Sequence, residues 1–335
     1  MGIEDPKKPD RRKFLKAAGA LGASSMLLDG DQIQEGTSGV YSGNMLENLS
    51  KSRKLPERSA ESRETTLADR ALNFFSKLLD IKVEGAQNLR EIPPGKHIIF
   101  LTTHLSDYDV PLAIAGLAKE GVRNLKAAVL STHTRFTQNP GGYVARRIGG
   151  PENTFVVSHD LGKGGKEKTV FNPNDFPPMK DALTAGNDLV MAAYLNLKIT
   201  YREKKWQLPE KGGNGGVYLA NSVPDTVIVP IAVDIESEPF GMGTNDIVAF
   251  IKNKARGTRA NIRIGKPIEP MKISGIEKFP NLLTKAKSGT HLTPEERGEF
   301  TRIRKELREE SNRVMQSLAE MLPREKRQGQ PQLEH

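Results

Sequence analysis

The chain contains no cysteine among its 335 residues, which excludes disulfides, thiolate metal sites and a cysteine nucleophile. It also lacks an apolar run of the roughly 18–20 residues that a membrane-spanning helix needs. The longest weakly apolar stretch covers residues 17–28, so any membrane contact is expected to be peripheral. Aromatic residues make up only 6% of the chain, and we find no aromatic platform on which nucleic acid bases could stack.

Positive charge is what the chain has in excess. Its 50 Lys and Arg residues outnumber 41 Asp and Glu residues, which gives a net charge of +9 and a pI near 9.5. Such a balance favours an anionic partner: nucleic acid, an anionic membrane surface, or a phosphorylated or CoA-type substrate. Because no nucleic-acid-reading motif accompanies the charge, we expect no nucleic acid partner.

The N-terminal 30 residues form a basic segment. Arg11 and Arg12, followed by "KFLK" and a mild apolar stretch, resemble a twin-arginine export signal. The alternative is a basic amphipathic segment that is disordered or touches anionic lipid. The next residues are rich in Gly, Ser and charge and lack periodicity, which indicates a disordered linker. The predicted organisation is a basic segment at 1–30, a linker at 31–65, a catalytic-type domain at 66–328 and a tail at 329–335.

Strand and helix patterns alternate through residues 66–328. This order predicts an α/β fold with a layered, mostly parallel or mixed sheet flanked by helices, whose active site lies beyond the carboxyl ends of the strands. Capping residues support the first and last helices: Thr66 in one, and Thr293 with Glu296 in the other. The predicted strands are 81–85, 98–102, 125–132, 154–159, 188–193, 226–235 and 261–268, and the predicted helices are 65–80, 110–120, 136–150, 178–186 with Gly186 as its cap, and 293–323.

The stretch "HLSDYD", residues 104–109, lies where a buried strand gives way to a helix. On an ideal helix, positions five apart differ by about 140°, so His104 and Asp109 meet only if the histidine lies on the preceding turn. An Asp bonded to one imidazole nitrogen makes the other a general base without a serine nucleophile. Ser106 could brace the turn. The alternative is a purely structural, hydrogen-bonded histidine.

The segment "IKVEGAQNLREIPPGKHIIFLTTHLSDYDVPL" resembles the opening of the glycerolipid (glycerol-phosphate and lysophosphatidic acid) acyltransferase family, of the His-x4-Asp type. The likeness extends, in order, through "FTQNPGGYVARRIGG", "LPEKGGNGGVYLANSVPDTVIVPIAV" and "IRIGKPIEP" over roughly residues 66–328. His104, Ser106 and Asp109 match the motif, while Thr103 replaces its Asn. Tyr194 stands where the family's third block, F-P-E-G-T-R, has its Glu.

The resemblance implies an O-acyltransferase that moves an acyl group from acyl-CoA or acyl-carrier protein to a glycerol-phosphate hydroxyl. His104 would be the general base and Asp109 its orienting partner, with no metal and no cofactor besides the acyl donor. The implied location is peripheral on the cytoplasmic membrane, or outside it if the N-terminal signal acts. A different acceptor and an exported, non-catalytic lipid-binding protein are the alternatives. Predicted substrate or phosphate contacts are Ser106, Arg146, Arg147, Arg202, Glu203, Lys204 and Lys211.

Overall fold

A computed structural model describes most of the predicted domain. The N-terminal segment, the linker, the tail and the predicted helix at 136–150 lie outside the described residues, apart from Gly150, so these expectations stay predictions. The described residues are 66–106, 108–130, 150–157, 160–161, 167–168, 172, 175–194, 208–209, 211–236 and 257–327.

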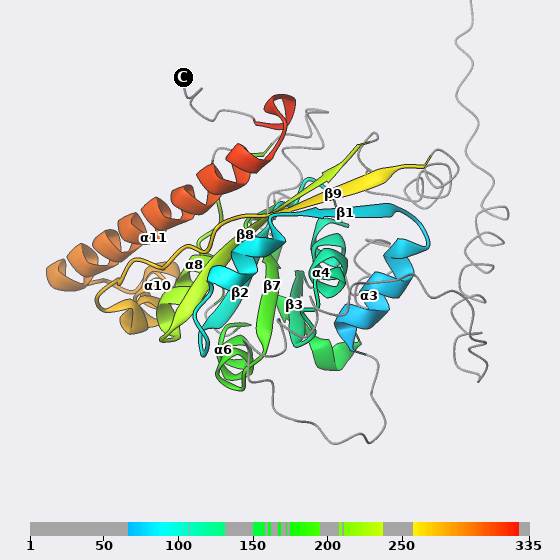
Figure 1. Ribbon diagram of the computed structural model, residues 1–335. Coiled ribbons are helices and arrows are strands. Elements are labelled where there is room, and N and C mark those ends of the chain that lie inside the picture. Colours follow the sequence, from blue (N-terminus) through cyan, green and yellow to red (C-terminus); the bar gives the residue numbers. More distant parts are fainter. Residues whose placement is uncertain are drawn as a thin grey trace, which may run out of the picture. The chain divides into compact units, whose positions relative to one another are not determined.

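The centre of the domain is a seven-stranded sheet in the order β1-β9-β8-β2-β7-β3-β4 (Figure 1). All neighbouring strands run parallel except β8 and β9, so the predicted mostly parallel α/β sheet is confirmed. A separate antiparallel pair joins two-residue strands. The strands are β1 (Asp80–Glu84), β2 (His97–Thr102), β3 (Leu125–Leu130), β4 (Thr154–Val157), β5 (Asp160–Leu161), β6 (Glu167–Lys168), β7 (Asp188–Ala192), β8 (Thr226–Ile235) and β9 (Arg259–Ile264).

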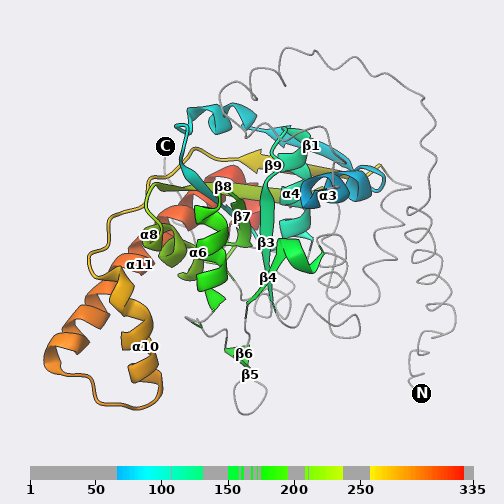
Figure 2. The ribbon, with the colours of Figure 1, turned by 90° about the horizontal axis from the view of Figure 1, so that it is seen from below.

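Helices cover both faces of this sheet (Figures 1 and 2). α3 (Leu67–Ser76) and α4 (Asp109–Lys119) share one apolar cluster with the strands. A second cluster joins the opposite face to α6 (Pro177–Thr184), α8 (Gly215–Ser222) and α11 (Pro294–Met321), with α10 (Phe279–Lys287) against α11. The central strands are therefore buried on both faces. Short 3-10 helices lie at Ala86–Glu91, Pro151–Asn153, Ile276–Lys278 and Arg324–Lys326.

The first helix is fixed by a reciprocal cap. The Thr66 hydroxyl accepts the backbone N–H of Asp69, while the Asp69 carboxylate accepts the backbone N–H of Thr66. Leu67, Ala71 and Phe75 are buried against the domain, as apolar spacing along the helix requires. The amphipathic face of α3 is thus used in packing. Among the described helices, none combines the length and the apolar content that a bilayer crossing needs.

Two helices, α8 and α10, were not predicted. α8 opens within "KGGNGG", and glycine has low helix propensity. These glycines allow close approach: a Cβ on Gly216 would come within 2.4 Å of Leu101 on β2, and one on Gly212 within 2.4 Å of Ser311 on α11. The Gly-rich stretch therefore brings α8 close to the sheet and to α11.

The strand predicted at 261–268 starts two residues later than the observed strand and extends four residues past its end. β9 begins at Arg259 and ends at Ile264, after which the chain turns through Gly265. The N–H of Gly265 donates to Pro230 at 2.8 Å. Pro267 has no N–H to donate, so the regular ladder is interrupted here, and pairing with β8 resumes at Ile268, which exchanges two hydrogen bonds with Ile228 at 2.7 and 3.0 Å.

Candidate active site

The site lies at the carboxyl end of β2, in the centre of the sheet. Thr102, the last residue of β2, is in register with Ala192 on β7 and with Ile231 on β8. The chain leaves the sheet at Thr103 and enters α4 at Asp109. Carboxyl ends of parallel strands are where α/β sheets bind ligands, so the predicted position of residues 103–109 is the observed one.

His104 is buried, with only 3% of its surface exposed. Its Nδ1 lies 3.1 Å from the backbone carbonyl oxygen of Ser106. A carbonyl oxygen can only accept, so Nδ1 is the nitrogen that carries the proton. In the neutral imidazole the lone pair is then on Nε2, and the ring has the tautomer that a base acting through Nε2 needs.

The carboxylate of Asp109, a residue that is 1% exposed, accepts hydrogen bonds from the loop that precedes α4. Oδ2 accepts the backbone N–H of Leu105 at 2.7 Å, and Oδ1 accepts that of Ser106 at 3.2 Å. The Ser106 hydroxyl also donates to Oδ1, at 2.5 Å. Since the Ser106 carbonyl accepts the proton on His104 Nδ1, Ser106 connects Asp109 to the imidazole.

The hydroxyl of Ser106 is engaged on both sides. It donates to Asp109 and accepts the backbone N–H of Tyr108 at 3.2 Å, and the residue is 1% exposed. These contacts brace the turn, which is one of the roles expected of Ser106. The single proton of this hydroxyl is thus donated within the loop, and the substrate contact expected of Ser106 stays a prediction.

Two further side chains tie the loop to neighbouring strands. The Thr103 hydroxyl accepts the backbone N–H of Val233 on β8 at 3.0 Å. The backbone N–H of Thr103 donates to the carbonyl of Ile231, also on β8, at 3.0 Å. The N–H of His104 donates to the phenolic oxygen of Tyr194 at 3.0 Å. Sequence reasoning noticed Tyr194 as a departure from the acyltransferase motif but did not place it in the site.

Burial governs the electrostatics of these groups. Loss of water raises the pKa of Asp109 from 3.8 to about 6, although the hydrogen bonds from Ser106 and Leu105 and the nearby Thr103 hydroxyl oppose the shift. Burial, and then the negative charge of Asp109, raise the pKa of Tyr194 well above its usual value. The phenol of Tyr194 therefore stays neutral beside the Asp109 carboxyl group, whose pKa is about 6.

The predicted contact residues are only partly covered by the described structure. Arg146, Arg147, Arg202, Glu203 and Lys204 lie outside it. Lys211 is described and exposed, and it precedes Gly212 in the turn that leads into α8.

That turn is fixed to the end of β7. The N–H of Gly213 donates to the carbonyl of Ala193 at 2.7 Å, and Ala193 directly precedes Tyr194. The structure thus brings His104, Ser106, Asp109 and Tyr194 together. Among the described residues, no group of three His, Asp or Glu side chains is placed to hold a metal ion.

No family model matches the chain, and no curated protein matches it. Among solved structures, the chain is similar to the 1-acyl-sn-glycerophosphate (LPA) acyltransferase PlsC from Thermotoga maritima. The two are 16% identical, and the likeness covers 67% of this chain and 77% of that chain with a TM-score of 0.33. We therefore draw no conclusion from this likeness, and we argue the chemistry of the site from the side chains of this chain alone.

Proposed function

We propose that the chain is an O-acyltransferase that moves a fatty acyl group from acyl-CoA or acyl-carrier protein to the hydroxyl of a glycerol-phosphate or lysoglycerol-phosphate. The observation that carries the proposal is the buried His104, whose Nδ1 lies 3.1 Å from the Ser106 carbonyl oxygen, which can only accept a hydrogen bond. With the proton on Nδ1, Nε2 is the basic nitrogen at the carboxyl edge of the sheet. The ordered sequence resemblance supplies the reaction class.

In this mechanism His104 Nε2 takes the proton of the acceptor hydroxyl as its oxygen attacks the thioester carbonyl. The carbonyl carbon becomes tetrahedral and its oxygen becomes an oxyanion. When the intermediate collapses, the C–S bond breaks and the thiolate takes the proton from the imidazolium. The carboxylate of Asp109 favours the positive charge that the imidazolium carries between these two steps.

The positive charge of the chain suits the proposed substrates. A phosphorylated acceptor and a CoA-type donor are both anionic, and Lys or Arg side chains bind phosphate through charge-assisted hydrogen bonds. We assign this role to Arg146, Arg147, Arg202, Lys204 and Lys211, with Glu203 as the acidic partner. The same charge supports peripheral binding to an anionic membrane surface.

Tyr194 supports a second candidate within the same chemistry. A neutral phenol beside His104, where the acyltransferase motif has a carboxylate, favours a different acceptor, such as a non-phosphorylated alcohol. The two candidates share the base and the donor, and they differ in whether the acceptor carries phosphate.

An acceptor panel tests the proposal. Labelled acyl-CoA and acyl-carrier protein are incubated with the full chain and glycerol 3-phosphate, lysophosphatidic acid or a monoacylglycerol, with the His104→Ala variant as the blank. We expect labelled lipid from a phosphorylated acceptor above that blank. Product from the monoacylglycerol alone selects the second candidate, and no product from any pair rejects acyl transfer.

A further inference from the structure

Tyr194 is aligned with His104 by the register of two neighbouring strands. Ala192 on β7 pairs with Thr102 on β2, so residues 194 and 104 each lie two positions beyond the same rung of the sheet. The N–H of Ala193 donates to the Thr102 carbonyl at 2.8 Å, which continues the pairing past the end of β7. The position of the tyrosine is therefore built into the sheet.

The tyrosine holds the backbone of His104 itself. Its hydroxyl oxygen accepts the N–H of His104 at 3.0 Å, and 2% of the residue is exposed. The four consecutive N–H groups at 103–106 donate to β8, to Tyr194 and, in two cases, to Asp109. Tyr194 and Asp109 thus accept three of these four N–H groups, those of residues 104, 105 and 106.

The two ring systems are also close. The imidazole of His104 and the ring of Tyr194 have centroids 6.5 Å apart and planes inclined by 54°. A side chain can keep its orientation only if its backbone is fixed, and the geometry of a reacting base tolerates errors of well under 1 Å. Loss of the phenolic oxygen would leave a buried N–H without its acceptor, and the loop would move to satisfy it.

We propose that Tyr194 is a positioning residue of this site, which holds His104 through its backbone N–H so that Nε2 meets the acceptor hydroxyl. The inference rests on the proposed function for its kinetic consequences. It also makes a structural claim about the His104 ring that can be measured without substrate.

Tyr218 on α8 offers a matched control. It is also 2% exposed, and its hydroxyl accepts a hydrogen bond from Lys180 Nζ at 3.2 Å. Its ring packs against Phe176 with centroids 5.0 Å apart, within the cluster shared with α6, α8 and α11. Tyr194→Phe and Tyr218→Phe each remove one oxygen from a buried tyrosine, so they share any general cost of the truncation.

The kinetic test compares these two variants. For Tyr194→Phe we expect kcat to fall by about 10- to 100-fold, with KM for donor and acceptor changed by less than about threefold. Tyr218→Phe keeps kcat within about threefold, and both variants melt at similar temperatures. Equal kcat values for the two variants, or a loss confined to KM, overturns the proposal.

The structural test uses the ring nitrogens of His104 in histidine-labelled protein, with His104→Ala to assign the signals. Wild-type protein is expected to show the tautomer protonated at Nδ1, and Tyr194→Phe to shift or broaden these signals while Tyr218→Phe leaves them in place. Unchanged signals in Tyr194→Phe contradict the positioning role. If wild-type protein transfers no acyl group, the proposed function fails, and this second measurement still decides on Tyr194.

Discussion

Asp109 and Asp234 are both buried, with 1% and 6% exposed, yet their surroundings are opposite in kind. The groups that donate to Asp109 are neutral: two backbone N–H groups and one hydroxyl. Asp234 on β8 instead lies between cations, with Arg263 Nη1 at 3.4 Å and Lys326 Nζ in direct contact. Asp234 is thus paired with charge, whereas Asp109 is buried among neutral donors.

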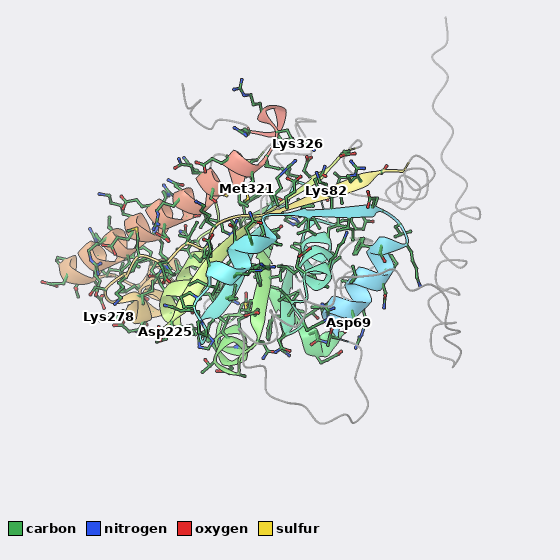
Figure 3. The ribbon with its side chains drawn as sticks, viewed as in Figure 1. Asp69, Lys82, Asp225, Lys278, Met321 and Lys326 are labelled. Carbon is green, nitrogen blue, oxygen red and sulfur yellow. The ribbon has the colours of Figure 1, made fainter. Side chains whose placement is uncertain are left out.

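The two aspartates also connect different parts of the fold. Asp109 fixes the loop between β2 and α4, at the carboxyl end of β2. Asp234 joins the end of α11 to the sheet, because Lys326 follows this helix and Arg263 also donates to the carbonyl of Met321 at 3.1 Å (Figure 3). We therefore expect damage at Asp109 to appear in activity and damage around Asp234 to appear in stability.

The largest expected effect is on catalysis. In Asp109→Asn, the amide NH2 would replace one carboxylate oxygen and so face the N–H of either Leu105 or Ser106, and the loop that carries His104 would lose that contact. We expect kcat/KM to fall by at least about 100-fold. Asp234→Asn, assayed under the same conditions, is expected to stay within about threefold of wild type. Similar losses in the two variants would remove the distinction between these aspartates.

The next effect concerns pH. Burial raises the pKa of Asp109 to about 6 from 3.8, so between these values the folded protein binds this proton more tightly than the unfolded chain does. As pH falls from 7 through that window, the free energy of unfolding of wild type should therefore rise relative to Asp109→Asn, by about 3 kcal/mol. Urea unfolding of both proteins at several pH values measures the difference. A constant difference would show that the pKa of Asp109 is not raised.

Activity should change in the opposite direction over the same pH range. Protonated Asp109 would no longer offer a negative charge to the imidazolium that the proposed mechanism forms on His104. We expect kcat to decline as pH falls below about 6. If Asp234→Asn removes this decline in kcat, the group whose protonation lowers activity is not Asp109.

A smaller effect is expected at the end of α11. Lys326→Met keeps the apolar stem but removes the charge that contacts Asp234, and the two side chains are 20% and 7% exposed. We expect the free energy of unfolding to fall by about 1–2 kcal/mol, with acyl transfer unchanged. A loss of activity without a loss of stability would link this cluster to the site.

The smallest effect is expected at an exposed ion pair on β1. Lys82 Nζ lies 2.7 Å from Glu84, but the side chains are 54% and 41% exposed. Water and salt screen such pairs, so Lys82→Met should change the free energy of unfolding by less than about 0.5 kcal/mol. If Lys82→Met lowers the free energy of unfolding as much as Lys326→Met does, burial does not explain the difference between the Lys82–Glu84 and Lys326–Asp234 pairs.

Much of the fold could be read from local sequence patterns. Buried strands such as β2 and β8 are continuous apolar runs, and Thr66 and Thr293 mark two helix starts by capping boxes that the structure contains. α8 was missed because its glycines lower helix propensity, while the packing that requires them involves β2 and α11, which are distant in sequence. Local pattern cannot report such contacts.

The same limit applies to the site. His104 and Asp109 are five positions apart, and their role could be suspected from spacing and from the resemblance. The contact between His104 and Tyr194 spans 90 positions and depends on which strands are neighbours and in what register. Only the order β2-β7 makes the second residue after β7 a partner of the second residue after β2.

The role of His104 as general base is tested most directly by His104→Ala against His97→Ala. His97 begins β2, at the opposite end of the same strand, and it is partly exposed. The account predicts that His104→Ala abolishes acyl transfer to the best acceptor while its thermal unfolding remains cooperative, and that His97→Ala retains activity within about threefold. Acyl transfer by a folded His104→Ala variant at the wild-type rate would contradict it.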